Sequence, residues 1–350
     1  MKISSKGAQS RKQACLLLRG SHTRLPLSPP DSAFAARLYR EVMVWKKYLD
    51  HVIDLYTSKP VQKLDQDVLR SLRVGAVQLL VLKTPPHAAV SATVEAHSRH
   101  RSRGFVNAVL RKIASHTDSE DLPLHIRYSH PEELTGRWLE LFGAERTRKL
   151  LQWNNSVPDL GGYAFGAHPA GSRPGRYLEN YRLLERDGRV EPGSGFYVQD
   201  EGAAAAAEGM ARLPGRTVLE IGAAPGGKTA HLDRNGFVVA MDLKPDRLER
   251  WRENRDRLKW RDSLAVAGDA CSLPFSIPFD KVIVDAPCTN TGVYRRRADA
   301  RWNWSGKLLR ELVGIQLRIL SDASAAVKPG GILVYSTCSI DPMENAGTAR

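Results

Sequence analysis

Residues 217–229, TVLEIGAAPGGKT, constrain the fold of this 350-residue chain more than any other stretch. The apolar and β-branched run Thr217–Ile221 is typical of a strand buried in a parallel sheet. A glycine-rich turn follows, Gly222–Lys228, and Thr229–Leu232 then predicts the start of a helix. Glycine lets a backbone approach a ligand closely, and a helix N-terminus offers unpaired N–H groups. The stretch therefore predicts a ligand site where a strand turns into a helix.

A carboxylate twenty residues after Gly222 suggests what the ligand is. Asp242 comes at the end of a second apolar run, Phe237–Met241. In a Rossmann-like βαβ unit, that spacing places an acidic side chain on the ribose hydroxyls of a nucleoside cofactor. Two other interpretations remain open at this point. Gly222–Thr229 also matches the P-loop pattern GxxxxGK[ST], and the stretch can be a purely structural strand-to-helix turn.

Beyond Arg216, predicted strands alternate with predicted helices, which indicates a parallel sheet with helices on both faces. The predicted strands are Val218–Ile221, Val238–Met241, Ser263–Val266, Lys281–Val284 and Gly331–Tyr335, and the helices include Lys244–Leu258 and Trp304–Ala326. Open sheets of this kind bind ligands beyond the carboxyl ends of their strands.

Acidic or thiol side chains follow four of these strands, namely Asp242, Asp269, Asp285 and Cys338. One aspartate at a strand end is commonly a loop cap, but four such residues converge on one crevice. A P-loop enzyme has a use for Asp285 as a magnesium ligand, but none for Asp242 or Asp269. Pro225 also removes an N–H that a phosphate cradle would use. The nucleoside-cofactor interpretation is therefore favoured.

The net charge of +14 is concentrated in the first third of the chain. Residues 1–130 contain 21 Lys and Arg against 10 Asp and Glu, whereas residues 131–350 contain 31 against 28. This asymmetry favours a nucleic-acid-binding module over a merely solvated basic surface. The four cysteines form no CxxC pair, which argues against a disulfide framework and a structural zinc site. We expect a cytoplasmic protein, without a metal, a signal peptide or a membrane span.

The N-terminal third predicts an all-α bundle over residues 31–120. Asp31 or Ser32 is expected to cap its first helix. Further helices are expected over Leu64–Leu82, His87–His97 and Arg103–Ile113. Residues 1–30 are basic and are expected to be mobile apart from one short helix. Residues 121–200 are expected to form a connector helix and a small α+β subdomain.

Several segments resemble the RsmB/Sun family of RNA cytosine-5 methyltransferases. In the C-terminal part they are VLEIGAAPGGKT, VIVDAPCTNTGV, RRRADARW and VYSTCSIDPMEN. LRVGAVQLL, PPHAAVSATVEA and RGFVNAVLRK resemble the NusB-like RNA-binding domain of the bacterial small-subunit rRNA members, and FYVQDEGA resembles the lead-in to their catalytic domain. The resemblance covers about residues 31–345. It implies a NusB-like bundle followed by an α/β Rossmann-like methyltransferase domain over 201–350.

The resemblance also implies roles for individual residues. Cys338 would add to carbon 6 of a cytosine, so that carbon 5 can attack the methyl group of S-adenosylmethionine. Cys288 would assist removal of the carbon 5 proton and release of the enzyme. Asp285 would hydrogen-bond the base near N3, and Lys228 would position the base or lower a thiol pKa. The implied cofactor-binding residues are Gly222, Ala223, Ala224, Pro225, Gly226, Gly227, Lys228, Asp242, Asp269 and Asp285. The target base must be unpaired or flipped out of a helix.

Other conspicuous side chains are expected to be structural: Cys15, Cys271, His87, His231, Trp302 and Trp304. For Arg295–Arg297, phosphate contact and a solvated charge run both remain open.

The chain departs from the family pattern at several places. Gly222 stands where the family usually has cysteine, Glu220 where aspartate is usual, and Asn290 where glycine is usual. The chain ends twelve residues beyond Cys338, whereas family members continue into a helix and a final pair of strands. The 201–350 domain is therefore expected to be C-terminally truncated.

Together these features predict an S-adenosylmethionine-dependent methyltransferase that modifies carbon 5 of a cytosine in 16S rRNA through a covalent Cys–cytosine intermediate. We expect it to be a monomer. The alternative is a non-catalytic RNA-binding protein with a degenerate or truncated methyltransferase domain. The sequence does not indicate which cytosine is modified.

Overall fold

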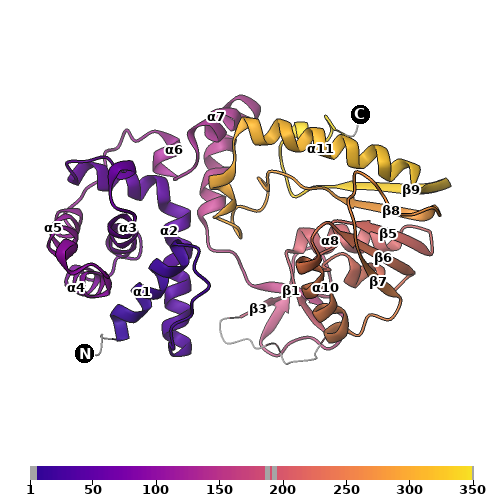
Figure 1. The fold of residues 1–350 in the computed structure, drawn as a ribbon, viewed down its shortest axis with the longest axis horizontal. Helices are drawn as coiled ribbons and strands as arrows, with labels where there is room; N and C mark the ends of the chain where they lie inside the picture. The colour runs from indigo at the N-terminus through magenta and orange to yellow at the C-terminus, as the bar shows by residue number, and fades with distance from the viewer. Residues whose placement is uncertain (1–5, 186–189, 191–194, 349–350) are drawn as a thin grey trace. The chain divides into compact units, whose positions relative to one another are not determined.

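Figure 1 shows the computed structural model, which describes residues 6–185, 190 and 195–348. The chain divides into two units. The first consists of Met1–Ser156 together with Val293–Ser305, and the second of Val157–Gly292 together with Gly306–Arg350. A short segment from the C-terminal half of the sequence is therefore part of the N-terminal unit.

The first unit is built around a helical core. Its helices are α1 (Lys6–Leu18), α2 (Pro29–Tyr56), α3 (Gln66–Leu80), α4 (Pro86–Ala96) and α5 (Arg103–Ile113), followed by α6 (Leu124–Arg127) and α7 (Glu132–Asn155). Aliphatic side chains from α2 to α5, such as Leu38, Leu72 and Leu110, are fully buried in one cluster. The helices predicted between residues 64 and 113 are confirmed, with ends that differ by one or two residues.

The short helix expected within residues 1–30 is confirmed as α1, which packs against α2 and α4 and has fully buried Ala8 and Ala14. The expected mobility of the rest of this segment stays a prediction, and residues 1–5 lie outside the described part of the chain. The predicted cap of α2 is wrong, because the cap is Ser28 rather than Asp31 or Ser32. The Ser28 hydroxyl accepts a hydrogen bond from Asp31 N, and proline is well suited to the first turn that follows.

Residues 293–305 are held in the first unit by buried polar contacts. Arg301 is fully buried, and its guanidinium donates to Asn155 Oδ1 at 2.8 Å and to Asn154 O at 3.1 Å. Trp302 Nε1 donates to Met43 O at 2.7 Å, and Trp304 is buried. Trp304 thus packs inside the protein, and half-buried Trp302 is held by its hydrogen bond, in line with the structural role expected for both.

Arg295 belongs to the same segment and also has partners within the first unit. Its guanidinium lies 4.0 Å from the ring centroid of Trp153, and its Nε donates to Ser156 Oγ at 2.9 Å. Arg295 is half-buried and has partners, so it is not part of a fully solvated charge run, and phosphate contact by Arg295–Arg297 stays a prediction. Arg297, by contrast, is 63% exposed.

The second unit begins with a small antiparallel sheet. Its strands are β1 (Gly161–Ala164), β2 (Ser172–Pro174), β3 (Tyr181–Leu184) and β4 (Phe196–Val198), in the order β2-β3-β1-β4. The described residues between 157 and 199 contain no helix, so the expected α+β character of this segment is wrong for them. Helix α8 (Glu201–Arg212) follows. Fully buried His231 bridges Gln199 and Glu208, with distances of 2.9 and 3.0 Å, which confirms its structural role.

The main sheet of the second unit is parallel throughout. Its strands are β5 (Thr217–Ile221), β6 (Phe237–Asp242), β7 (Ser263–Ala267), β8 (Phe279–Asp285) and β9 (Val327–Ser336), in the order β7-β6-β5-β8-β9. All five predicted strands are confirmed. The chain leaves β5 for β6 on one side and later returns to β8 on the other. Ligands bind at such a switch point, beyond the carboxyl ends of β5 and β8.

Helices of different lengths accompany this sheet (Figure 1). Helix α10 (Pro245–Leu258) contacts β6 and β7, and α11 (Gly306–Ala325) contacts β8 and β9. The helix predicted to start at Thr229 is a single turn, α9 (Thr229–Leu232). None of the described helices is long and apolar enough to cross a membrane.

Candidate active site

The glycine turn after β5 lies against the end of β8. Gly222 has a φ of +78°, and a Cβ at this position would overlap Asp285 O. Glycine adopts this φ without strain and leaves room for the two strand ends to approach in this way. At the other end of the turn, Lys228 Nζ lies 2.6 Å from Asp285 Oδ2. Two of the predicted catalytic residues thus form an ion pair.

The two predicted catalytic thiols are in contact. Cys288 follows β8 and Cys338 follows β9, and their Sγ atoms are 3.2 Å apart. Gly292 N donates to Cys338 O at 2.9 Å, which ties the two loops together. The charges of Asp285 and Lys228 both act on Cys338, so the structure brings all four predicted catalytic residues into one cluster.

The contact between the thiols shifts their pKa values in opposite directions. The hydrogen bond from Cys338 lowers the pKa of Cys288, although burial opposes this. The same hydrogen bond and burial raise the pKa of Cys338, and the negative charge of Asp285 adds to the effect while Lys228 opposes it. The two shifts make Cys288 the more acidic of the two thiols in this geometry. Cys338 can become a nucleophile only by giving up its proton, and Cys288 is in position to accept it.

Asn290 also contacts the predicted nucleophile. Its Nδ2 donates to Cys288 O at 2.8 Å, and its Oδ1, 3.2 Å from Cys338 Sγ, is a second acceptor for the single Cys338 thiol proton, in competition with Cys288. A carbonyl can only accept a hydrogen bond, so the amide nitrogen must face Cys288 and the oxygen must face Cys338. Asn290 adopts a φ of +61°, a conformation that asparagine tolerates better than most residues. The turn therefore forms with asparagine in place of the glycine usual in the family.

A buried carboxylate supports the loop after Cys288. Glu344 is fully buried, and its Oε1 accepts from Thr289 N at 2.9 Å and from Gln316 Nε2 at 3.1 Å. The Thr289 hydroxyl donates to the other carboxylate oxygen. Glu344 was not among the predicted site residues, although it lies in the conspicuous segment VYSTCSIDPMEN. Asn290 was not among them either, and its only signal was its departure from the family pattern.

Asp242, the predicted ribose ligand, also shapes the glycine turn. Its Oδ2 accepts from Ala224 N at 3.3 Å and lies 3.1 Å from Arg247 Nη1. Arg247 Nη2 in turn donates to Ala224 O at 2.7 Å. Asp242 and Arg247 therefore hold the backbone of the turn from both sides. Arg247 was missed in the sequence, where it is one of many arginines in a predicted surface helix.

The P-loop interpretation has no support in the geometry. The Thr229 hydroxyl donates to Glu220 Oε2 at 2.6 Å and accepts from Trp251 Nε1 at 2.9 Å, and it is fully buried. Lys228 is paired with Asp285. Neither side chain is thus directed at a phosphate or a magnesium ion. Burial raises the pKa of Glu220 to about 7, although the hydrogen bond from Thr229 opposes this.

Asp269 and Cys15, two further residues singled out in the sequence, lie outside the cluster of catalytic residues. Asp269 follows β7, beyond Asp242 in the strand order, and its Oδ1 accepts from Cys271 N at 2.9 Å. Cys15 lies in the first unit, where burial raises its pKa to about 12. Among the described residues, no group of three or more His, Cys, Asp or Glu side chains could hold a metal ion.

Comparisons with known proteins support the predicted architecture. Residues 210–349 match the family model of the 16S rRNA methyltransferase RsmB/F, and residues 1–115 match that of the NusB family. The ribosomal RNA small subunit methyltransferase B of Cronobacter sakazakii is 30% identical over 99% of this chain and 89% of its own length. The protein of the same name from Vibrio cholerae is 33% identical, over 91% and 80%.

A solved structure is similar over the whole chain. The crystal structure of PH0851 has a TM-score of 0.81 and 22% identity, over 100% of this chain and 89% of that one. This likeness and the NusB match confirm the predicted fold class, a helical NusB-like region followed by an α/β domain with a parallel sheet.

Proposed function

Because this chain belongs to the RsmB/F family of S-adenosylmethionine-dependent rRNA cytosine-5 methyltransferases, we propose that it methylates a cytosine of 16S rRNA through a covalent bond to Cys338. The observation that carries the proposal is the thiol pair of Cys288 and Cys338, with Sγ atoms 3.2 Å apart. This pair lies at the carboxyl ends of β8 and β9, where parallel sheets of this kind bind their ligands.

The residues along this edge of the sheet fit S-adenosylmethionine. The glycine-rich turn Gly222–Lys228 offers a backbone that a ligand can approach closely. The carboxylates of Asp242 and Asp269 follow neighbouring strands and can accept hydrogen bonds from ribose hydroxyls and an adenine amino group. When bound, the cofactor supplies an electrophilic methyl group.

The nucleophile forms when Cys338 loses its proton, either to Cys288 across the 3.2 Å contact or to solvent. The positive charge of Lys228 favours the new anion, so Cys288 assists this step without being required for it. The Cys338 thiolate then adds to carbon 6 of the cytosine. This addition makes carbon 5 an enamine-like nucleophile, which would take the methyl group of bound S-adenosylmethionine and release S-adenosylhomocysteine.

The remaining steps restore the aromatic ring. Asp285 hydrogen-bonds the protonated N3 of the adduct and stabilises it electrostatically. Cys288, once it has released its proton to solvent, takes the proton from carbon 5. The electrons of the carbon 5–hydrogen bond re-form the carbon 5–carbon 6 double bond as the bond to Cys338 breaks. The departing Cys338 thiolate takes up the proton of N3, so that both cysteines end as thiols.

The proposal is tested by methyl transfer from tritiated S-adenosylmethionine to 16S rRNA that lacks modifications. The full chain is expected to label the RNA, and nucleoside analysis is expected to find the label in 5-methylcytosine. A Cys271→Ala variant serves as a thiol control and should be as active as the unaltered chain. A folded protein that binds the cofactor and the RNA but transfers no methyl group would favour a non-catalytic RNA-binding role.

A further inference from the structure

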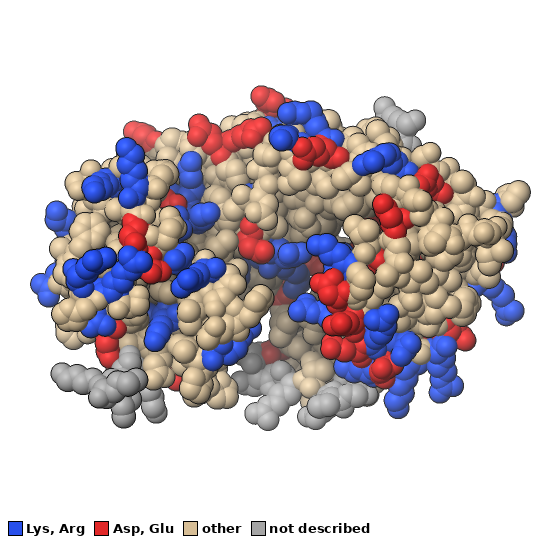
Figure 2. Space-filling view, viewed as in Figure 1, with Lys and Arg blue, Asp and Glu red and all other residues tan. Residues whose placement is uncertain are grey.

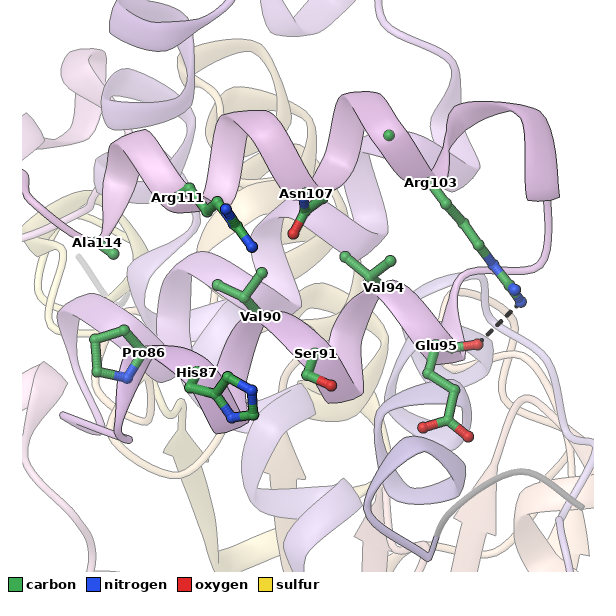
Figure 3. Close-up of a pocket in the computed structure, with 11 residues that line it drawn as sticks. Pro86, His87, Val90, Ser91, Val94, Glu95, Arg103, Asn107, Arg111 and Ala114 are labelled. Atoms are coloured by element: carbon green, nitrogen blue, oxygen red, sulfur yellow. Dashed lines mark hydrogen bonds between the residues drawn. The ribbon is translucent and has the colours of Figure 1, made fainter.

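A groove lies between α4 and α5 of the first unit. It has a volume of about 840 Å³ and is lined only by residues of these two helices and their ends (Figure 3). At one end, Arg103 Nη2 donates to the backbone oxygens of Glu95 and His97, each at 3.1 Å. These bonds fix the start of α5 against the end of α4. The groove is therefore a defined feature of the bundle.

The groove combines an apolar floor with polar side chains that have no partner. Val90 is 6% exposed and Val94 is half-buried, and both form the side that α4 contributes. From α5, Asn107 and Arg111 extend toward these valines (Figure 3). Within the described part of the chain, neither of these two side chains makes a hydrogen bond or an ion pair. Their donors and acceptors are thus free to bind a ligand.

The charge around the groove indicates a polyanionic ligand. Residues 86–115 contain five Lys and Arg but only one acidic residue, Glu95. Two of these cations, Arg103 and Arg111, line the groove, whereas Arg99 is paired with Asp65 and Asp67. Figure 2 shows Lys and Arg side chains gathered over this part of the first unit. A guanidinium suits a phosphate, an amide offers a donor and an acceptor to a base edge, and aliphatic carbons can cover the face of a base.

We propose that the groove between α4 and α5 binds an unpaired segment of the RNA substrate, with Arg111 on a phosphate and Asn107 on a base edge. This inference rests on the proposed function, because it takes RNA as the substrate. Single-stranded RNA is favoured because its bases are accessible to side chains in a groove of this kind, whereas those of a helix are stacked and paired. An acidic peptide is the competing ligand.

Gly104 allows the groove to be filled without disturbing the fold. It lies on the first turn of α5, at the edge of the groove, and a Cβ there would meet no atom within 4 Å. Replacing a helical glycine by leucine also improves helix propensity. Gly136 in α7 is a matched control, since a Cβ there would likewise meet nothing and the residue does not line the groove.

The first experiment compares Gly104→Leu with Gly136→Leu in the full chain. RNA affinity is measured by fluorescence anisotropy with a labelled fragment of unmodified 16S rRNA, and folding by thermal unfolding. Gly104→Leu is expected to weaken binding about tenfold, as the loss of one good contact would. Gly136→Leu is expected to change it less than twofold. Equal affinities for the two variants would overturn the inference.

The second experiment compares two adjacent cations. Arg111 lines the groove and Lys112 does not, although both are exposed. Arg111→Gln is expected to weaken binding several-fold and to lower the slope of log K against log salt by about 0.7, the value for one phosphate contact of a single strand. Asn107→Ala should weaken binding without changing that slope. Equal losses in Arg111→Gln and Lys112→Gln would indicate a diffuse basic surface and contradict the inference.

Methyl transfer in the same samples separates this inference from the proposed function. If the unaltered chain transfers methyl groups and Gly104→Leu binds RNA normally, the groove assignment is wrong and the proposed function stands. If the chain transfers none but Gly104→Leu still weakens RNA binding, the proposed function fails and the groove assignment stands. If polyglutamate binds the chain and Gly104→Leu abolishes only that binding, the ligand is an acidic peptide and the inference is wrong.

Discussion

Asn290→Gly is predicted to make Cys338 more acidic and more reactive. The asparagine oxygen accepts a hydrogen bond from the Cys338 thiol at 3.2 Å, which stabilises the protonated form. Glycine tolerates the φ of +61° at this position, so the substitution removes the acceptor without straining the turn. A hydrogen bond of this kind contributes about 1 kcal/mol. At about 1.36 kcal/mol per pKa unit, its loss lowers the pKa of Cys338 by about 0.7.

The assay is the rate at which iodoacetamide alkylates Cys338, followed by mass spectrometry of its peptide. Below the pKa, the thiolate fraction rises in proportion to the acid dissociation constant, so a fall of about 0.7 gives about a fivefold faster reaction. Asn290→Asp should slow the reaction, because a carboxylate close to the sulfur disfavours the thiolate. Cys271, in another loop, is the internal control. An unchanged or slower rate for Cys338 in Asn290→Gly would refute the reasoning.

Three further substitutions test other parts of the site. Gly222→Ala forces a side chain into a φ of +78° and against Asp285 O, so it should cost at least about 1 kcal/mol and weaken cofactor binding, measured by urea unfolding and calorimetry. Glu344→Ala leaves Thr289 N without its acceptor in a buried loop; it should cost about 1–3 kcal/mol and lower kcat more than it raises KM. Burial raises the pKa of Glu220 to about 7 in the folded protein. Between about pH 4.5 and 7, folded Glu220 therefore keeps a proton that the unfolded chain has lost, and the free energy of unfolding falls as the pH rises through this range. Unfolding at pH 5 and pH 8 should show this loss, of the order of 3 kcal/mol, in the unaltered chain and not in Glu220→Gln.

The parallel sheet and its strand-end residues were predictable because they depend on local pattern. Apolar runs of the right length form the strands, and the order of parallel strands then places Asp285 and Cys338 at one edge. The contact between Cys288 and Cys338 follows from the pairing of β8 with β9. The antiparallel sheet before α8 was less predictable, because its strands are only three or four residues long.

Other features depend on contacts between residues far apart in the sequence. Arg301 lies in an arginine-rich segment typical of an exposed surface, yet it is buried against Asn154 and Asn155. The role of Glu344 depends on its contact with Thr289, a residue 55 positions away. Helix α1 is stabilised by packing against α2 and α4 rather than by a strong apolar pattern of its own. No local pattern predicts contacts of this kind.

The most direct test of the account asks which sulfur forms the bond to cytosine. Each variant is incubated with unmodified 16S rRNA and S-adenosylmethionine, and protein bound covalently to RNA is counted on a denaturing gel. The account predicts that Cys288→Ala accumulates the adduct, because the carbon 5 proton is no longer removed, and that Cys338→Ala forms none. An adduct in Cys338→Ala and none in Cys288→Ala would contradict it.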